Sequence, residues 1–271
     1  MTLRRVPNTP TPAFQRHIGI TYSGAETPDS GLKGLRIGLA VGDAPAADVA
    51  PPPGPRRYWT RRGVAEWLTK ALADGPPTLV GIAHPFSFPL RYFEVHQLPP
   101  DWDAFLDDFQ RHWPTDGEHM YVDFVRDGSG GDSAARSGSV RWRRLTEERA
   151  GNAARSVFQF EGQGTVAKAA HAGIPWLRFL RRRLGARVHF WPFDGWAIPA
   201  GRSALVELCP ALCKPDSTPD GRDRAAHTAC AMADRLQQAD RDGHLADALG
   251  PALRPGERPV AQVEGWILGV G

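Results

Sequence analysis

Five short segments of the chain carry the apolar pattern of β-strands. In the first, Ile18 and Ile20 fall on the same face, because side chains alternate across a strand. The third, with the sequence Thr-Leu-Val-Gly-Ile-Ala, is apolar on both faces, which is typical of a buried parallel strand. The first two segments are close enough along the chain to pair like a hairpin. The predicted strands cover residues 17–22, 35–41, 78–83, 188–191 and 204–209.

Apolar residues spaced three and four apart predict helices between and after these strands. Thr60 and Asp101 are typical N-cap residues and predict the starts of two helices. A third helix is expected over residues 166–184, with Pro175 as its start or as a kink and Gly185 as its stop. Further helices are predicted over residues 223–240 and around Val260 and Val263.

This order of strands and helices predicts one α/β domain with a mixed sheet and helical insertions. We expect the domain to cover residues 16–271, preceded by a flexible, polar and proline-rich arm over residues 1–15. Residues 127–139 are rich in Gly and Ser and show no periodicity, so they predict a flexible loop or a lid.

Charge and composition narrow the class of protein. The 271 residues contain 33 Lys+Arg and 30 Asp+Glu, a net charge of +3, which excludes a chain-wide polycation for nucleic acid but not a local basic patch. No apolar run approaches the length of a membrane span, and the first residues lack the apolar stretch of a secretory signal. With only 3 Cys, we expect a reduced, cytoplasmic setting.

The basic residues are almost all Arg, which together with abundant Ala, Gly and Pro suggests a GC-rich bacterial genome. Arginines cluster in three places. The first two clusters could contact phosphates, whereas the third is typical of a solvated helix face. The clusters lie at residues 56–62, 141–144 and 181–183.

Glu207 is the most informative single residue. It stands near the end of the apolar run Ala-Leu-Val-Glu-Leu-Cys, where a carboxylate is not buried without a partner. Because active sites of α/β folds lie at the carboxyl ends of strands, Glu207 is a candidate catalytic residue. The alternatives are a solvated sheet edge or an ion pair with one of the arginines.

Two histidines are further candidates for acid–base chemistry. His84 follows the buried strand and could act as an acid or a base, or could pack and make a single hydrogen bond. His227 lies on the helix predicted over residues 223–240, beside Thr228, which is expected to face the sheet. Trp191, with the aromatic residues that follow it at 193 and 196, could line an apolar pocket or belong to the core.

Metal and cofactor motifs are weak. Cys209, Cys213, His227 and Cys230 are ligand types that zinc accepts, but their spacing matches no strong finger pattern, and buried Cys is usually a small apolar residue. Ser23 with a histidine and an acid could form a hydrolytic triad, but no G-x-S-x-G elbow is present. No nucleotide-binding glycine motif is present, and we expect no cofactor.

Several phrases spread over nearly the whole chain resemble a bacterial domain-of-unknown-function family of predicted nucleases with the RNase H fold. That family implies a five-stranded mixed sheet flanked by helices and hydrolysis by two divalent metal ions held on carboxylates. The matching phrases lie at residues 18–25, 80–89, 190–196, 206–211, 226–229 and 264–269.

The resemblance places the family's acids on Thr21, Ala83, Glu207 and Thr228, and only Glu207 is an acid. A hydroxyl or a methyl group cannot replace a carboxylate in neutralising a divalent cation. We therefore expect a dismantled metal site with no bound metal.

The function that we expect is a metal-independent enzyme of specialised metabolism, acting by acid–base chemistry on a small organic molecule at the former nuclease cleft. One alternative is an inactive pseudo-nuclease that binds nucleic acid or a protein. Another is a residual Mg- or Mn-dependent nuclease that uses Glu207 with Asp223. The expected catalytic residues are Glu207, His84 and His227, and the expected substrate-binding residues are Thr21, Tyr22, Ser23, Ala83, Trp191 and Thr228.

Overall fold

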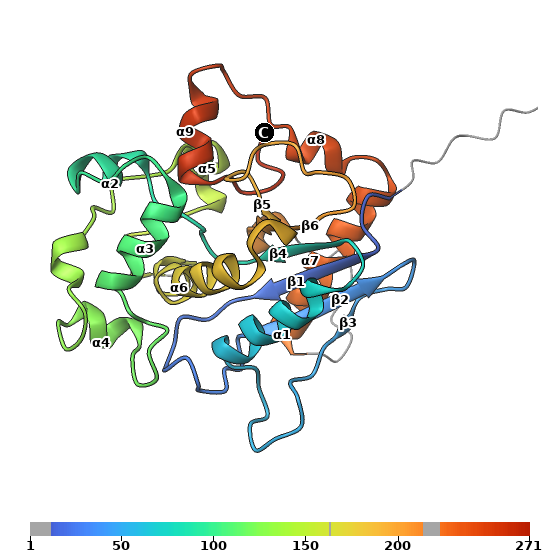
Figure 1. Ribbon diagram of the computed structural model, residues 1–271, viewed down its shortest axis with the longest axis horizontal. Coiled ribbons are helices and arrows are strands. Elements are labelled where there is room, and N and C mark those ends of the chain that lie inside the picture. The colour runs from blue at the N-terminus through green and yellow to red at the C-terminus, as the bar shows by residue number, and fades with distance from the viewer. Residues whose placement is uncertain (1–11, 163, 214–222) are drawn as a thin grey trace, which may run out of the picture.

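Six strands form one mixed sheet in the computed structural model, which describes residues 12–162, 164–213 and 223–271 (Figure 1). The order across the sheet is β3-β2-β1-β4-β6-β5. Strand β2 is antiparallel to β1 and β3, whereas β1, β4, β6 and β5 are mutually parallel. The strands are β1 (Arg16–Thr21), β2 (Arg36–Val41), β3 (Ala47–Asp48), β4 (Thr78–Ile82), β5 (Val188–Phe190) and β6 (Ser203–Glu207).

The five predicted strands are confirmed, as are the hairpin-like pairing of β1 with β2 and the burial of β4 on both faces. The expected number of five strands is wrong, because β3 adds a sixth. It has two residues, too few to show an apolar period, and it pairs with Gly38 and Leu39 of β2.

Helices cover both faces of the sheet (Figure 1). On one face lie α1 (Arg61–Ala73) and α6 (Ala167–Leu184), with α3 (Trp102–His112) packed against α6. The other face carries α7 (Arg224–Arg241), which crosses β1 and β2 so closely that a Cβ atom on Gly19 would lie 2.3 Å from the carbonyl oxygen of Ala229. The glycines of β1 and β2 therefore set the distance between the sheet and α7.

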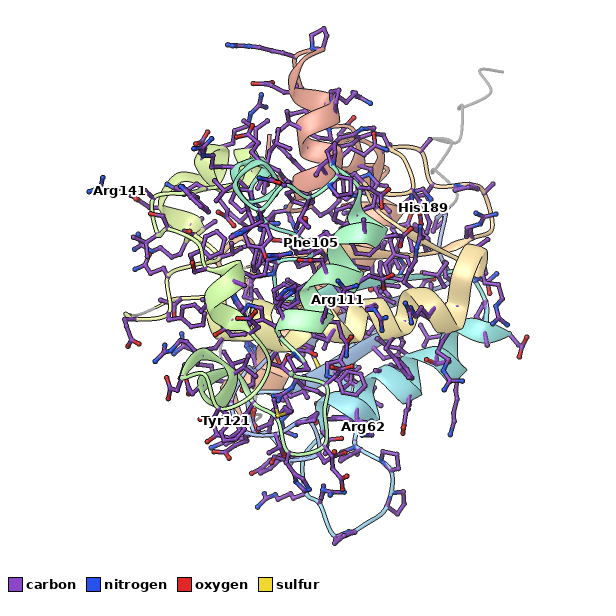
Figure 2. The ribbon with its side chains drawn as sticks, turned by 60° about the vertical axis from the view of Figure 1, so that its left-hand side comes forward. Arg62, Phe105, Arg111, Tyr121, Arg141 and His189 are labelled. Atoms are coloured by element: carbon purple, nitrogen blue, oxygen red, sulfur yellow. The ribbon has the colours of Figure 1, made fainter. Side chains whose placement is uncertain are left out.

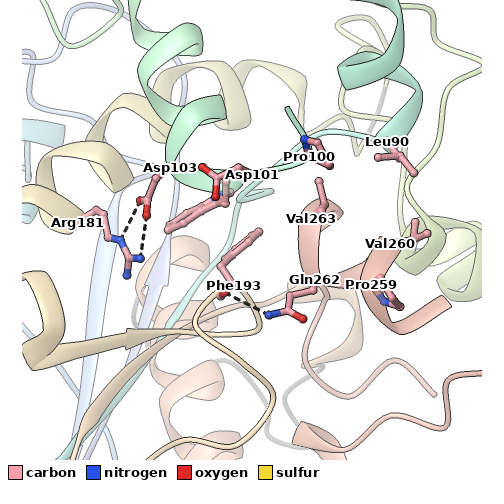
Figure 3. A pocket seen from close by; sticks show the side chains of 11 residues that line it. Leu90, Pro100, Asp101, Asp103, Arg181, Phe193, Pro259, Val260, Gln262 and Val263 are labelled. Carbon is pink, nitrogen blue, oxygen red and sulfur yellow. Dashed lines mark hydrogen bonds and ion pairs between the residues drawn. The ribbon is translucent and has the colours of Figure 1, made fainter. Parts of the chain in front are cut away.

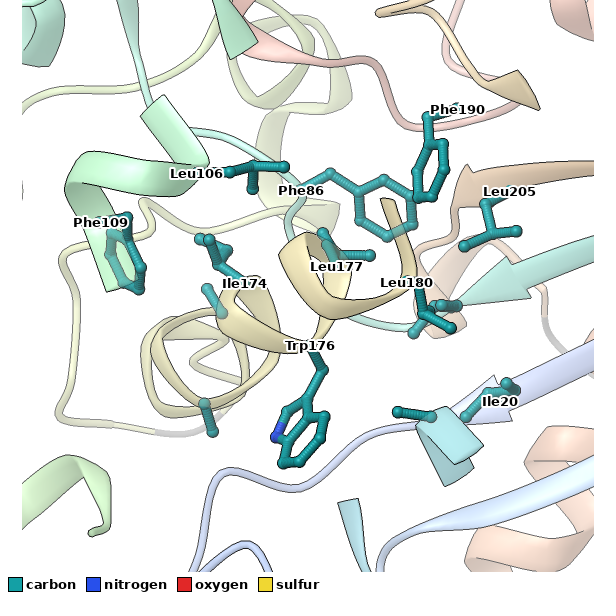
Figure 4. Close-up of a cluster of buried hydrophobic side chains, with 14 of the residues drawn as sticks. Ile20, Phe86, Leu106, Phe109, Ile174, Trp176, Leu177, Leu180, Phe190 and Leu205 are labelled. Carbon is teal, nitrogen blue, oxygen red and sulfur yellow. The ribbon is translucent and has the colours of Figure 1, made fainter. Parts of the chain in front are cut away.

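The main apolar core lies around α6. Its Leu177 and Leu180 meet Phe86, which follows β4, and Leu205 of β6 (Figure 4). Pro175 lies inside α6 and does not start it. Because proline has no N–H to donate within the helix, the carbonyl of His171 accepts a hydrogen bond from the Thr115 hydroxyl instead, at 2.6 Å.

The predicted helix starts are confirmed. The side chains of Thr60, Asp101 and Asp223 accept hydrogen bonds from the backbone N–H groups of α1, α3 and α7 respectively. The shorter helices are α2 (Leu90–Val95), α4 (Val122–Arg126), α5 (Leu145–Ala150), α8 (Leu245–Leu249) and α9 (Glu257–Glu264), with 3-10 turns at Ser133–Arg136, Gly151–Ala153, Gly185–Arg187 and Pro210–Leu212.

The segment predicted as a flexible loop or a lid is anchored in its middle. Ser133 is buried and donates to the carbonyl of Val125, and Arg136 forms a bidentate ion pair with Asp108. Of the expected N-terminal arm, residues 1–11 lie outside the described residues, whereas Phe14 is buried on the fold. No helix of the described residues has the length and apolar character needed to cross a membrane.

Candidate functional site

Glu207 ends β6 and is buried, with both carboxylate oxygens engaged. Nη2 of Arg144 donates to Oε1 at 2.6 Å, and Nη1 donates to Oε2 at 2.7 Å. The backbone N–H of Phe86 also donates to Oε2. Of the arrangements considered from the sequence, the structure therefore has the ion pair with an arginine and not the solvated sheet edge.

Arg144 is as buried as the carboxylate it binds. It caps α5, and its Nε donates to Glu147 Oε1 at 2.7 Å, while Nη1 also contacts the carbonyl of Glu264. Burial alone would lower the pKa of Arg144, but the carboxylates of Glu207 and Glu147 outweigh it and raise that pKa above its ordinary value. The guanidinium is thus a permanently charged group enclosed by acids.

A third acid completes this group. Glu264, the last residue of α9, accepts the backbone N–H of Leu90 on Oε1 and that of Leu145 on Oε2, both at 2.6 Å. Burial raises the pKa values of both Glu147 and Glu264. The four side chains, called the Arg144 cluster below, tie β6, α5, α9 and the start of α2 together, and they are Arg144, Glu147, Glu207 and Glu264.

His84 lies next to this cluster and is enclosed by neighbouring groups. Its Nδ1 is hydrogen-bonded to the carbonyl of Pro85 at 2.8 Å, and its ring lies 4.4 Å from that of Tyr22. A Cβ atom on Gly173 would lie 2.5 Å from Nε2 of His84, so α6 rests directly on the ring. Burial lowers the pKa of His84 to about 4. The imidazole is therefore neutral near pH 7 and packs as an apolar ring with one hydrogen bond.

The space around Glu207 and His84, at the carboxyl ends of β6 and β4, is small. A cavity of about 40 Å³ borders Ala83, His84, Glu207 and Arg144, and one of about 10 Å³ borders Tyr22. Sites for small organic molecules span about 300–1,000 Å³. The structure thus brings Ala83, His84 and Glu207 together as expected, but around a volume suited to water.

The other expected site residues lie outside that cavity. The Thr21 hydroxyl accepts the N–H of Arg36, and the Ser23 carbonyl accepts a bond from Arg61. Trp191 is fully buried against the ring of Trp196.

Two expected residues lie on α7. Thr228 is half-buried, and its hydroxyl donates a hydrogen bond to the carbonyl of Arg224 in its own helix. This hydroxyl therefore does not contact the sheet in the way that the sequence predicted. It borders an open pocket of about 430 Å³ with Lys33 and Asp223. His227 is half-buried and does not border any of these three cavities as far as the described residues define them.

The residues at this site do not fit the two divalent metal ions that the family resemblance implies. Glu207, the one acid among the four positions that the resemblance assigns to metal ligands, is satisfied by Arg144, and Asp223 caps α7 while pairing with Arg36. Within the described part of the chain, no three His, Cys, Asp or Glu side chains form a group that could hold a metal ion. The zinc ligands considered from the sequence are included in this finding, so among the described residues they do not form a metal site. Two of them, Cys213 and Cys230, lie in separate apolar clusters.

The arginines of the three clusters are divided between contacts within the fold and the exposed surface. Arg61 is fully buried and donates to three backbone carbonyls. Arg62 pairs with Asp29, and Arg181 of the expected solvated face pairs with Asp103 and Asp194. Exposed arginines include those at 56 and 57 and Arg141, whose side chain extends outward at the margin of the molecule (Figure 2).

Two larger pockets are lined by no residue of the Arg144 cluster. The first, called the α3–α9 pocket, has a volume of about 510 Å³ and opens at the carboxyl end of β5 (Figure 3). Trp102 and Phe193 stack in it with ring centroids 4.0 Å apart, and Val260 and Val263 line it from α9. The second has a volume of about 650 Å³ and includes Trp196.

The expectation that this aromatic run lines a pocket is confirmed for Phe193 and Trp196, in two different pockets. Sequence reasoning missed Trp102 as a pocket residue, because its helical spacing indicates only an apolar face. It also missed Arg144, which carries no local pattern that points to Glu207.

Comparison with family models, with curated proteins and with solved structures found no match to the chain. The geometry of the described residues therefore carries the functional conclusion.

Proposed function

We propose that this chain is an RNase-H-like α/β protein whose two-metal nuclease site has been replaced by the Arg144 cluster, and that it binds and acts on a small organic molecule without metal. The observation that carries the proposal is the bidentate contact of Arg144 with Glu207, the one acid retained at the position of the family's metal ligands. The guanidinium supplies the positive charge that a divalent ion would otherwise supply.

The mixed sheet with helices on both faces supports the RNase-H-like assignment. Phosphodiester hydrolysis by two metals needs several hard oxygen ligands around the ions. At Thr21 and Thr228 there is a hydroxyl, at Ala83 a methyl group, and at Glu207 a carboxylate that already has three donors. Nuclease chemistry is therefore disfavoured at this position.

The α3–α9 pocket is the site that we assign to the small molecule. Ligands of open α/β sheets bind outside the carboxyl ends of the strands, and this pocket opens there beside β5. Its volume of about 510 Å³ is in the usual range for such ligands. The stacked rings of Trp102 and Phe193 favour a planar, largely apolar molecule.

The polar groups at this pocket define the chemistry available there. Asp101 and Asp103 are exposed carboxylates, and Asp103 is oriented by Arg181 at 2.9 Å (Figure 3). The side-chain nitrogen of Gln262 lies 3.5 Å from the carbonyl of Phe193. Acid–base steps in this pocket would use the aspartates, in place of the expected Glu207, His84 and His227, which lie elsewhere.

A thermal-shift screen of planar organic compounds tests the assignment. In Val260→Trp the larger side chain fills the pocket, so a compound that raises the Tm of the wild type should lose its effect. Val140→Trp is the matched control, because Val140 is 58% exposed and does not line the pocket. Equal shifts in both variants would place the ligand elsewhere and contradict the assignment.

A further inference from the structure

A pocket of about 650 Å³, called the α7–α8 pocket, lies apart from the site proposed above. It lies where α7 ends, beside α8 and the loop that leads from β5 into β6. It shares no lining residue with the α3–α9 pocket or with the Arg144 cluster. Its main apolar side chains are Phe14, Trp196, Ile198, Leu245 and Leu249.

Three charged side chains also line this pocket, and only one of them, the carboxylate of Asp240, has its charge stabilised by hydrogen bonds from neighbouring groups. Asp240 accepts the backbone N–H groups of Ala13 and Phe14 and is hydrogen-bonded to Nε2 of His17, all at 2.9 Å. The other two are Arg202 and Arg258, and neither forms an ion pair with any residue in the described ranges. The pocket is thus apolar with an excess of positive charge.

Trp196 links the apolar and the charged parts. The guanidinium of Arg258 lies over its ring, 4.9 Å from the centroid, which holds the cation at the wall of the pocket. The cation of Arg258 therefore lies beside the aromatic wall that Trp196 gives to the pocket.

We propose that the α7–α8 pocket binds an amphipathic carboxylate. The apolar body would lie against Ile198, Leu245 and Leu249, and the carboxylate would accept hydrogen bonds from Arg202 and Arg258. A cationic molecule would be repelled by the two guanidinium groups, and a neutral apolar one would leave them without an anion.

Isothermal titration calorimetry with decanoate tests this site, with decanol as the neutral molecule of matched chain length. Decanoate should bind saturably, and decanol should bind at least about tenfold more weakly, the difference expected for two charge-assisted hydrogen bonds. The double variant Arg202→Gln/Arg258→Gln should lose at least about tenfold in affinity for decanoate. Arg141→Gln removes an exposed charge outside the pocket and should leave the affinity unchanged.

A second variant, Ile198→Trp, should abolish decanoate binding by filling the pocket, with Val140→Trp as its surface control. Absence of saturable decanoate binding, equal affinities for decanoate and decanol, or unchanged binding in the double variant would overturn the proposal. Because the pocket is separate from the α3–α9 pocket, these outcomes are independent of the proposed function.

Discussion

Arg144 and Glu207 form a buried, bidentate ion pair at the end of β6, with N–O distances of 2.6 and 2.7 Å. The strand end is where an α/β protein usually presents its catalytic groups. Here the same position holds a charged contact that joins β6 to the N-terminus of α5. Glu207 is therefore buried in a structural contact and is not open to solvent.

Removing the cation from this framework should be strongly destabilising. In Arg144→Met the buried carboxylates of Glu207 and Glu147 lose their counter-ion, and we expect the free energy of unfolding to fall by about 3–5 kcal/mol. The double variant Arg144→Met/Glu207→Met should recover part of the loss, because one uncompensated charge is removed. Urea denaturation measures both.

Arg182→Met is the control for that prediction. Arg182 pairs with Asp107 at the surface, where both side chains are more than half exposed, so its loss should cost less than about 1 kcal/mol. If Arg144→Met were no more destabilising than Arg182→Met, the ion cluster would not have the structural role assigned to it.

The buried histidine at the end of β4 should make stability depend on pH. The ordinary pKa of 6.5 falls to about 4 in folded His84, so the unfolded chain binds the proton more readily. Stability is therefore fully present above pH 6.5 and is lost as the pH falls toward 4, by about 3 kcal/mol from this group. His171, whose pKa is also lowered to about 4 by burial, adds a loss in the same direction.

Urea unfolding of His84→Gln across this range isolates the contribution of His84. The variant should lose less stability on acidification than the wild type, whereas His119→Gln, at an exposed histidine, should follow the wild type. An NMR titration that placed the pKa of His84 near neutrality would instead favour the acid–base role expected from the sequence.

The engaged arginines predict weak binding to nucleic acid. Because Arg61, Arg62 and Arg144 are held by partners within the protein, these three cations of the arginine clusters do not displace counter-ions from a phosphate backbone. Fluorescence anisotropy with single-stranded DNA and with an RNA–DNA hybrid should show no binding in about 0.15 M salt. Tight binding with a steep salt dependence would support the pseudo-nuclease alternative instead.

Much of the sheet could be predicted because its strands carry their own apolar pattern. β1 and β4 show it within a few residues, and the helix caps at Thr60 and Asp101 are equally local signals. The two residues of β3 are too few for a period, so this strand depends on pairing with β2.

The site was only partly predictable for a related reason. The need of Glu207 for a partner follows from its apolar neighbours, but that partner is 63 positions away along the chain. The local sequence pattern does not indicate which of the arginines pairs with Glu207. Likewise, Phe193 signals an aromatic pocket, whereas the approach of Val260 and Val263 depends on how α9 folds back. The pairing of Arg144 with Glu207 and the position of α9 at the pocket both depend on long-range packing, which leaves no local pattern in the sequence.

Calorimetric titration with Mn²⁺, followed by a nuclease assay in Mg²⁺ or Mn²⁺, tests most directly whether the Arg144 cluster replaces a metal site. We predict no saturable Mn²⁺ binding in the millimolar range or tighter, and no metal-dependent cleavage of single-stranded or hybrid substrates, because Arg144 already neutralises Glu207. Saturable Mn²⁺ binding that is lost in Glu207→Gln, with cleavage that depends on the metal, would contradict the account.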